Sequence, residues 1–224
     1  MKNLVKGSYK QLIVDTGVEM IEKAITVGTW GNISARDPET GLIYISPSGM
    51  DYVSIKPQHV VVMDQNLEII DGEAEPSIEK NMHAAVYRER KDANAVIHTH
   101  PTYSTVFGVT DTPMKAVSED FVQIVGDEVL TAKPYQLPGS PELAETAVKW
   151  LGNKNAVLLP GHGALTCGKD MKMTLKVSLV LEKNAQIFLF AKLMGSDIRT
   201  FTRAEIDAMQ NFAKNHYGKK NEGL

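Results

Sequence analysis

Three short apolar runs constrain the fold of this chain more than any other feature of its sequence. They are VVVMD (60–64), AVIHTH (95–100) and NAVLLP (155–160), and each has the length of a buried strand. Strands of this kind belong in a sheet that is covered on both faces. Two more β-type runs flank the turn DPETG (37–41), which predicts a hairpin. Helical segments are interspersed, so we expect an α/β fold with a mixed sheet covered by helices, not an alternating parallel barrel.

Helix start and stop signals place the expected helices around this sheet. Ser77 is an expected N-cap, Ser140 followed by Pro141 is another, and Thr202 with Glu205 forms a capping box. Together with the apolar periodicity they predict helices near 12–25, 78–89, 141–151, 170–193 and from 203 towards 216. No repeat, low-complexity tract or linker divides the chain, and we expect residues 1–224 to form one domain.

The composition excludes several classes of protein. The net charge of −3 gives no basic field for nucleic acid or an anionic membrane. No apolar run approaches the roughly 18–20 residues that span a bilayer, and the N-terminus does not resemble a signal peptide. The single cysteine, Cys167, excludes an intrachain disulfide framework and favours a reducing compartment. We therefore expect a cytoplasmic protein.

Three histidines are candidate metal ligands. His98 and His100 are two residues apart at the end of a predicted strand, so both imidazoles lie on one face. His162 lies between two glycines on a tight turn after another strand. Three histidines that leave an open position are typical of a catalytic metal site. Paired core histidines and an exposed turn histidine are the alternative interpretation.

Carboxylate, hydroxyl and glycine groups complete the candidate site. Glu79 and His83 are spaced i, i+4 on one helix face, where Glu79 could ligate a metal or act as a general base. His83 is a possible fourth ligand, although a core role is favoured. The segments GTWGNIS (28–34), SPSG (46–49) and Pro76–Ser77 offer backbone N–H groups and hydroxyls suited to an anion such as phosphate. Each segment alone is also consistent with an ordinary turn.

Five of these stretches together resemble a known family. GTWGNIS, YISPSGMDY, PSIE preceding MH, DANAVIHTHP and LLPGHGAL occur in the order typical of the class II aldolase/adducin family. The resemblance covers about residues 10–217. It implies a three-layer α/β/α sandwich around a mostly antiparallel sheet, assembled as a C4 homotetramer with active sites between subunits.

The resemblance also implies roles for individual residues. It implies one divalent ion per subunit on His98, His100 and His162, with Glu79 as a further ligand and the acidic catalytic residue. Zinc is the expected ion, and manganese or cobalt are alternatives because the same ligands accept all three. The implied phosphate-binding residues are Asn32, Ser48, Gly49 and Ser77. Ile78 replaces a frequent second serine, which leaves the identity of the anion open.

A second acid or base is implied across the subunit interface. Asp120 matches an aspartate of the family's epimerases, and its neighbour Glu119 is an alternative because a related dehydratase has a glutamate there. Tyr217, followed by Gly218, matches a C-terminal tyrosine of the aldolases and epimerases. A charged loop and a packing residue are the plainer interpretations of these positions.

The expected activity is that of a carbon–carbon lyase. A metal-dependent aldolase would cleave a ketose phosphate of the L-fuculose 1-phosphate type by retro-aldol reaction, giving dihydroxyacetone phosphate and an aldehyde. The alternatives are an L-ribulose-5-phosphate 4-epimerase-like reaction, or a decarboxylase or dehydratase that works through a metal-stabilised enolate. An adducin-like assembly module and an HxH barrel metallohydrolase are less favoured, because the full histidine set is present and the strand order does not suggest a barrel.

Overall fold

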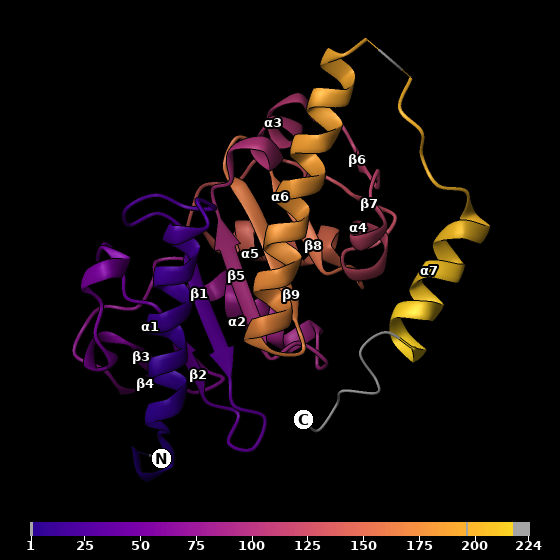
Figure 1. Cartoon of the computed structure of the whole chain (residues 1–224). Helices are drawn as coiled ribbons and strands as arrows, with labels where there is room; N and C mark the ends of the chain where they lie inside the picture. Colours follow the sequence, from indigo (N-terminus) through magenta and orange to yellow (C-terminus); the bar gives the residue numbers. More distant parts are fainter. Residues whose placement is uncertain (1, 196, 217–224) are drawn as a thin grey trace.

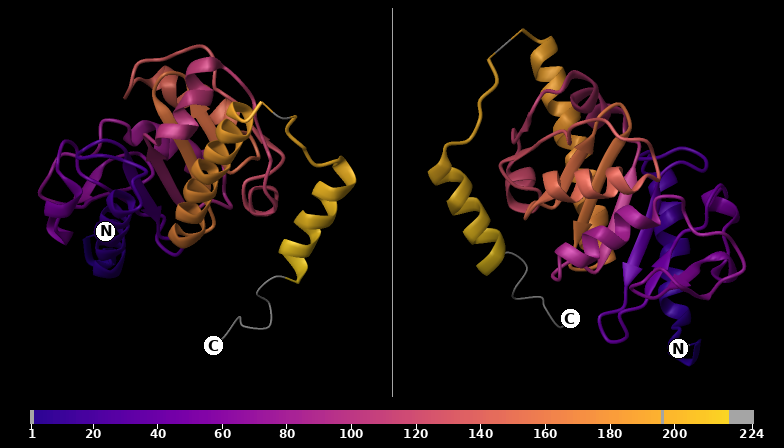
Figure 2. Two further views of the ribbon diagram at one scale, coloured as in Figure 1. Left: turned by 45° about the horizontal axis from the view of Figure 1, so that its top comes forward. Right: turned by 180° about the vertical axis from the view of Figure 1, so that it is seen from behind.

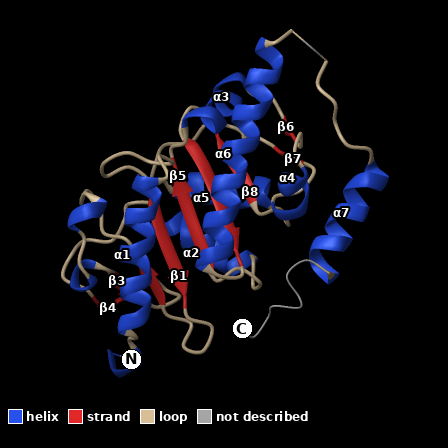
Figure 3. Cartoon of the chain, viewed as in Figure 1, coloured by secondary structure: helices blue, strands red, loops and turns tan. Residues whose placement is uncertain are grey.

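The computed structural model describes residues 2–195 and 197–216, in which a seven-stranded sheet lies between two layers of helices (Figures 1 and 3). Neighbouring strands of this sheet are antiparallel, and an isolated parallel bridge joins Thr131 to Leu158 at its edge. The strand order is β4-β3-β2-β1-β5-β9-β8. The bounds are β1 (Asn32–Arg36), β2 (Ile43–Ile45), β3 (Val61–Met63), β4 (Ile69–Asp71), β5 (Ala95–Thr99), β8 (Ala156–Leu159) and β9 (Gly163–Gly168).

Helices cover both faces of the sheet, as the apolar strands predict. One layer contains α2 (Lys80–Glu89) and α5 (Pro141–Leu151), and the other contains α1 (Gly7–Glu22) and α6 (Met171–Leu193) (Figure 2). Val96 of β5 packs into the α2 and α5 layer, whereas Ala95 and Ile97 pack towards α1 and α6. This is why the run AVI is apolar on both faces. The α/β/α sandwich around a mostly antiparallel sheet is confirmed.

Smaller elements extend the α6 layer. They are α3 (Thr102–Thr110), α4 (Glu119–Ile124), α7 (Arg203–Asn215), β6 (Met114–Lys115) and β7 (Glu128–Val129). Phe107 of α3, Phe121 of α4 and Ile206 of α7 share an apolar cluster with α6, β8 and β9. None of the helices in the described ranges has the length and apolar character needed to cross a membrane.

Some helix boundaries differ from the sequence-based expectation. α1 ends at Glu22, before the expected residue 25, and Ala24 adopts a positive φ of 54° just after it. α2 begins at Lys80 instead of residue 78, and Glu79 is its N-cap. The hydroxyl of Ser77 accepts a hydrogen bond from the Glu79 backbone N–H at 3.2 Å, so Ser77 stabilises the turn that precedes the helix. α3, α4 and the two-stranded β6–β7 sheet were not predicted.

The antiparallel register gives the three central strands two distinct ends. Asn32 pairs with His98, and Thr99 pairs with Ala164, so these residues mark what we call the histidine end. The opposite end, where Ala95 pairs with Gly168 and β1 finishes at Arg36, is called the arginine end.

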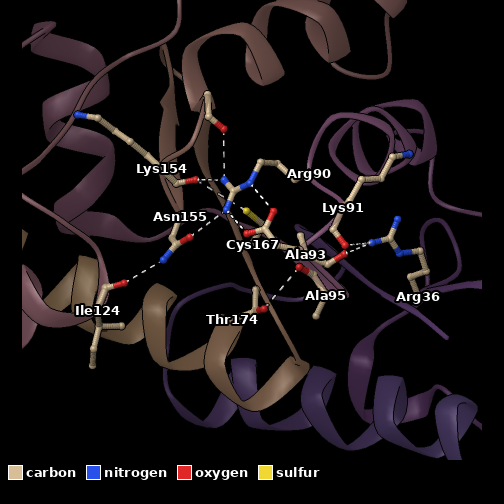
Figure 4. Close-up of polar contacts among 12 residues, drawn as sticks. Arg36, Arg90, Lys91, Ala93, Ala95, Ile124, Lys154, Asn155, Cys167 and Thr174 are labelled. Atoms are coloured by element: carbon tan, nitrogen blue, oxygen red, sulfur yellow. Dashed lines mark hydrogen bonds and ion pairs between the residues drawn. The ribbon is translucent and has the colours of Figure 1, made fainter. Parts of the chain in front are cut away.

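Two arginines hold the loops of the arginine end (Figure 4). The Arg90 guanidinium donates to both carboxylate oxygens of Asp92 at 2.9 and 2.8 Å, and to the carbonyls of Gly152 and Lys154 at 3.2 and 2.5 Å. Arg36 donates to backbone carbonyls around the end of α2, namely those of Tyr87, Lys91 and Ala93. Charge-assisted bonds of this kind satisfy carbonyls that a helix C-terminus leaves unpaired.

Candidate metal centre and active site

The three predicted histidines come together at the histidine end of the sheet. His98 and His100 follow one another at the end of β5, and His162 lies in the turn between β8 and β9. One ligand nitrogen from each ring lies within 4.8 Å of the others. The turn needs glycine at position 163, because a Cβ there would lie 2.2 Å from the carbonyl oxygen of Thr99. The tight pairing of β5 with β9 thus brings the rings into contact.

Burial keeps these imidazoles neutral. It lowers the pKa of His98 to about 3 and that of His162 to about 4, and it lowers the pKa of His100 as well. His98 Nδ1 lies 3.0 Å from the carbonyl oxygen of Ala164, which can only accept, so Nδ1 carries the proton and Nε2 presents its lone pair to the site. His98 Nε2 and His100 Nε2 are 2.9 Å apart. Neutral imidazole nitrogens that converge in this way fit a divalent ion.

Glu79 places a carboxylate beside the triad. Its Oε2 lies 3.3 Å from His98 Nε2 and accepts a hydrogen bond from Asn32 Nδ2 at 2.7 Å. Its Oε1 lies 3.8 Å from His162 Nε2. Oε1 is buried without a hydrogen-bond partner among the described residues, and so is His162 Nδ1. Buried polar atoms without partners are costly in a native protein, and Glu79 Oε1 faces the triad, where an ion or a substrate would satisfy it.

The loops predicted for phosphate lie next to each other and to Glu79. The Ser48 N–H donates to the Glu75 carbonyl at 2.9 Å, and the Ser77 N–H donates to the Ser46 carbonyl at 3.1 Å. Ser48 and Gly49 are exposed, and Gly49 has a φ of +67°. Asn32, the fourth residue of the predicted set, contacts Glu79 instead of these loops. Its role in phosphate binding stays a prediction.

Asp120 is not part of this cluster in the described chain. It lies in the first turn of α4, and its Oδ2 accepts a hydrogen bond from Lys183 Nζ at 2.6 Å. Partial burial raises the pKa of Asp120, but hydrogen bonds from Lys183 and Ser118 outweigh burial and lower it overall. Glu119 precedes it in the same turn. Tyr217 lies outside the described residues.

Comparisons with known proteins show the family of this chain. The family described as "Class II Aldolase and Adducin N-terminal domain" matches residues 11–189. A 5-deoxy-D-ribulose 1-phosphate aldolase from Bacillus thuringiensis serovar kurstaki is 37% identical over 209 residues, which are 93% of this chain and 95% of that protein. The chain belongs to the class II aldolase and adducin family.

Two further relatives show how the family's fold and activities are distributed. A solved structure of an L-fuculose 1-phosphate aldolase has a TM-score of 0.90 and 34% identity, and the match covers 94% of this chain and 98% of that one. A 3-oxo-tetronate 4-phosphate decarboxylase from Haemophilus influenzae is 30% identical over 212 residues, which are 92% of this chain and 98% of that protein. This member of the class II aldolase and adducin family therefore resembles both lyases that release an aldehyde and a lyase that releases carbon dioxide.

The structure of this family member also shows contacts of three site residues, Ser34, Tyr87 and Trp30, that the sequence did not indicate individually. Ser34 and Tyr87 extend the contacts of Asn32 and His83 into the core. The Trp30 ring lies 5.5 Å from that of His100 and is 63% exposed, so it forms a rim of the site. The spacing Glu79–x3–His83–x3–Tyr87 opposite Asn32–x–Ser34 is the signal that could have found the first two.

Proposed function

We propose that this chain is a metal-dependent aldolase that cleaves a ketose 1-phosphate of the L-fuculose 1-phosphate type. The products are dihydroxyacetone phosphate and an aldehyde. One observation carries the proposal: three neutral imidazoles converge beside Glu79, whose Oε1 is buried and unpartnered. The names of the aldolase relatives support the same reaction.

His98, His100 and His162 would hold one divalent ion in each subunit, with Glu79 as a further ligand. Zinc suits three imidazoles with an open position, and manganese or cobalt would accept the same ligands. When bound, the ion supplies Lewis acidity for the charge that develops on the substrate's carbonyl oxygen. Trp30 covers one side of His100 and would limit the access of water to this position.

The residues of the chain would move two protons. Cleavage of the C3–C4 bond removes a proton from the hydroxyl on C4 and adds a proton at C3. Glu79 Oε1 is the group placed to exchange the proton at C3, because it faces the triad and has no competing hydrogen bond. The C4 hydroxyl proton requires a second group, for which Asp120 or Tyr217 of a neighbouring subunit are the candidates, with Glu119 as an alternative to Asp120.

The phosphate would be held by the adjacent loops at Ser48, Gly49 and Ser77, together with Asn32. The backbone hydrogen bonds between these loops fix them against one another before substrate binds. Ile78, which is 62% exposed, offers no hydroxyl here. The hydroxyls of Ser48 and Ser77 and the backbone N–H of Gly49 would therefore carry more of the binding than in relatives with a second serine, because the N–H groups of Ser48 and Ser77 already donate between the loops.

We also propose a homotetramer of fourfold symmetry, formed in the cytoplasm by chains that are each one domain over residues 1–224. Exposed apolar side chains on α3 and on the last turns of α6 support an assembly of this kind, because apolar surface of this extent is usually covered. They are Val106, Val109, Phe190, Leu193 and Met194. The contact between Tyr103 and Phe190, with ring centroids 6.0 Å apart, places the two helices side by side.

A decarboxylase is the second candidate function. The Haemophilus relative carries that name, and loss of carbon dioxide from a 3-oxo acid leaves the same kind of charge next to a carbonyl. The pairing of Glu79 with the triad would serve either reaction. An epimerase that breaks and re-forms the same bond is favoured only by the position of Asp120.

A panel of sugar phosphates tests these alternatives. The metal-loaded protein should release an aldehyde from a ketose 1-phosphate, and the assay should score epimerisation and carbon dioxide separately. Glu79→Gln should retain the metal, measured by elemental analysis, and lose about 100- to 10,000-fold in kcat, the range typical of a lost general acid or base. Carbon dioxide release without aldehyde release would select the decarboxylase, and a fully active Glu79→Gln would remove Glu79 from the mechanism.

A further inference from the structure

A buried chain of hydrogen bonds runs inward from Glu79. Asn32 Nδ2 donates to Glu79 Oε2 at 2.7 Å, and Asn32 Oδ1 lies 2.6 Å from His83 Nε2. His83 Nδ1 lies 2.7 Å from Ser34 Oγ, which lies 2.7 Å from the Tyr87 hydroxyl. All five residues are buried. The side chains therefore form one continuous polar path through an otherwise apolar layer.

The path follows from the geometry of a helix packed along a strand. Helix α2 presents a side chain to this path every four residues, a rise of about 6 Å: Glu79 at its N-cap, then His83 and Tyr87. Asn32 and Ser34 are two residues apart on β1, a rise of about 6.6 Å. Because the two spacings nearly match, each side chain of β1 fits between two side chains of α2.

The carboxylate fixes the direction of every hydrogen bond in the chain. A carboxylate only accepts, so the Asn32 amide must turn its N–H towards Glu79 and its carbonyl towards His83. Burial lowers the pKa of His83 to about 3, so the ring is neutral and has one N–H. That hydrogen must be on Nε2, because only a donor can face the Asn32 carbonyl.

The same logic continues to the end of the chain. With its proton on Nε2, His83 accepts at Nδ1, so the Ser34 hydroxyl donates to it. Ser34 Oγ then accepts from the Tyr87 hydroxyl, which stays protonated because burial raises its pKa. Among the described residues, the Tyr87 hydroxyl contacts Ser34 Oγ and also accepts a hydrogen bond from the Val96 backbone N–H. This series of hydrogen bonds ends in the core and does not reach solvent at Tyr87. It is therefore suited to holding the side chains in place and not to conducting protons.

We propose that His83, Ser34 and Tyr87 are positioning residues that lock the Asn32 amide and thereby divide the two oxygens of Glu79 between two tasks. Oε2 is held by Asn32, and Oε1 is left free towards His162 for the substrate proton. The task of Oε1 rests on the proposed function, whereas the locked amide and the tautomer of His83 do not. Asn32 acts on the carboxylate here, a task beyond its predicted contact with phosphate.

The tautomer of His83 provides the first test. Long-range 1H–15N spectra of 15N-labelled, metal-free full-length protein distinguish Nε2–H from Nδ1–H imidazoles. The expected result is a neutral Nε2–H ring from pH 5 to pH 8. In Ser34→Ala the donor to Nδ1 is gone, so we expect the Nδ1 signal of His83 to shift, while the proton stays on Nε2 opposite the Asn32 carbonyl. A neutral Nδ1–H ring in the unmodified protein would overturn the proposal.

Kinetics provide the second test, with a matched control. Ser178 on α6 is a buried serine whose hydroxyl lies 2.7 Å from that of Thr166, on the other face of the sheet. Removing a group that orients a site residue typically costs about 10- to 100-fold, so Ser34→Ala and Tyr87→Phe should lower kcat by that amount with KM and metal content unchanged. Ser178→Ala should lose stability alone.

The kinetic test decides whether Ser34 and Tyr87 act as positioning residues. Equal kcat values for Ser34→Ala, Tyr87→Phe and Ser178→Ala would reject the positioning role, even if all three variants are less stable. If the unmodified protein turns over no sugar phosphate, the proposed function fails instead. In that case the spectra of His83 still decide whether the amide of Asn32 is locked, because they need neither metal nor substrate.

Discussion

The two ends of the central strands are built from the same sheet but treat their polar groups in opposite ways. At the arginine end, Arg36 and Arg90 collect backbone carbonyls and the Asp92 carboxylate (Figure 4). At the histidine end, Glu79 Oε1 and His162 Nδ1 are buried without partners. At the arginine end these polar groups are paired within the protein. At the histidine end the two atoms have no partner among the described residues.

This difference indicates that the contacts at the arginine end stabilise the fold, whereas the groups at the histidine end are available for catalysis. Satisfied, charge-assisted contacts lower the free energy of the folded state, whereas unpartnered groups raise it unless a ligand binds. The two ends are not isolated, because the Arg36 guanidinium lies 5.0 Å from the ring centre of Tyr87, the last member of the buried chain from Glu79. Substitutions at the histidine end should therefore change activity, and those at the arginine end should change stability.

The largest expected effect is at the histidine end. His162→Gln removes one of three imidazoles, and the Lewis acid it helps to hold is worth several kcal/mol at the transition state. We expect kcat/KM to fall by about 1000-fold or more. The melting temperature of the metal-free protein should stay the same or rise, because a buried ring nitrogen without a hydrogen-bond partner is lost. A large fall in melting temperature would show that the histidine end also stabilises the fold.

The next effect is at the arginine end. Arg90→Met removes the charged donor to the carbonyls of Gly152 and Lys154 and to the Asp92 carboxylate, and the free energy of unfolding should fall by about 2 to 3 kcal/mol. Urea unfolding followed by circular dichroism measures it, with Arg88→Met as the control because Arg88 is exposed on the same helix. kcat should not change. Loss of activity at unchanged stability would contradict the division of roles between the ends.

A pH series sharpens the comparison. The pKa of His83 is lowered to about 3 by burial, so below pH 6.5 the unfolded chain binds a proton that the folded chain does not. The contribution of His83 to the free energy of unfolding is therefore fully present above pH 6.5. It falls by about 2 kcal/mol between pH 6.5 and pH 5. Urea titrations of the metal-free protein should show this loss relative to His83→Gln. Identical pH dependence in the two proteins would show that His83 is charged inside the fold.

The smallest effect concerns α3, the helix that follows His100. The Glu182 carboxylate accepts from the backbone N–H groups of Tyr103 and Ser104, both at 2.8 Å. Glu182→Gln should cost about 1 kcal/mol of stability, as the loss of an N-terminal cap does, and a few-fold in kcat because the helix orients His100. Glu142→Gln, in the exposed first turn of α5, is the control for stability. Equal kcat in both variants would separate α3 from the site.

Local signals allowed much of this fold to be predicted from the sequence. Ser140 and Thr202 cap the helices that they were expected to cap, and DPETG turns the expected hairpin. α3 was missed because TYSTVFGV is rich in β-branched residues with low helix propensity. Its cap, Glu182, lies 79 residues from Tyr103 along the chain, so no local pattern reveals it.

The candidate site was predictable in its ligands but not in its supports. His98, His100 and His162 lie at the ends of apolar strands whose antiparallel pairing brings them together, and Glu79 reaches them from the start of α2. The role of Ser34 was missed, because the spacing Asn32–x–Ser34 becomes informative only when β1 is known to pack along the side of α2 that carries His83 and Tyr87. Sequence patterns also did not reveal Lys183 as the partner of Asp120, because the two residues are far apart along the chain.

The near match between α2 and β1 limits how this segment can change in evolution. A one-residue insertion between Glu79 and Tyr87 would rotate every later side chain by about 100° around the helix axis, and a one-residue shift in β1 would turn Ser34 to the opposite face of the sheet. Point substitutions on the exposed side of α2 leave the alignment intact. Between positions 79 and 87 the length of the chain should therefore be more strictly preserved than its composition.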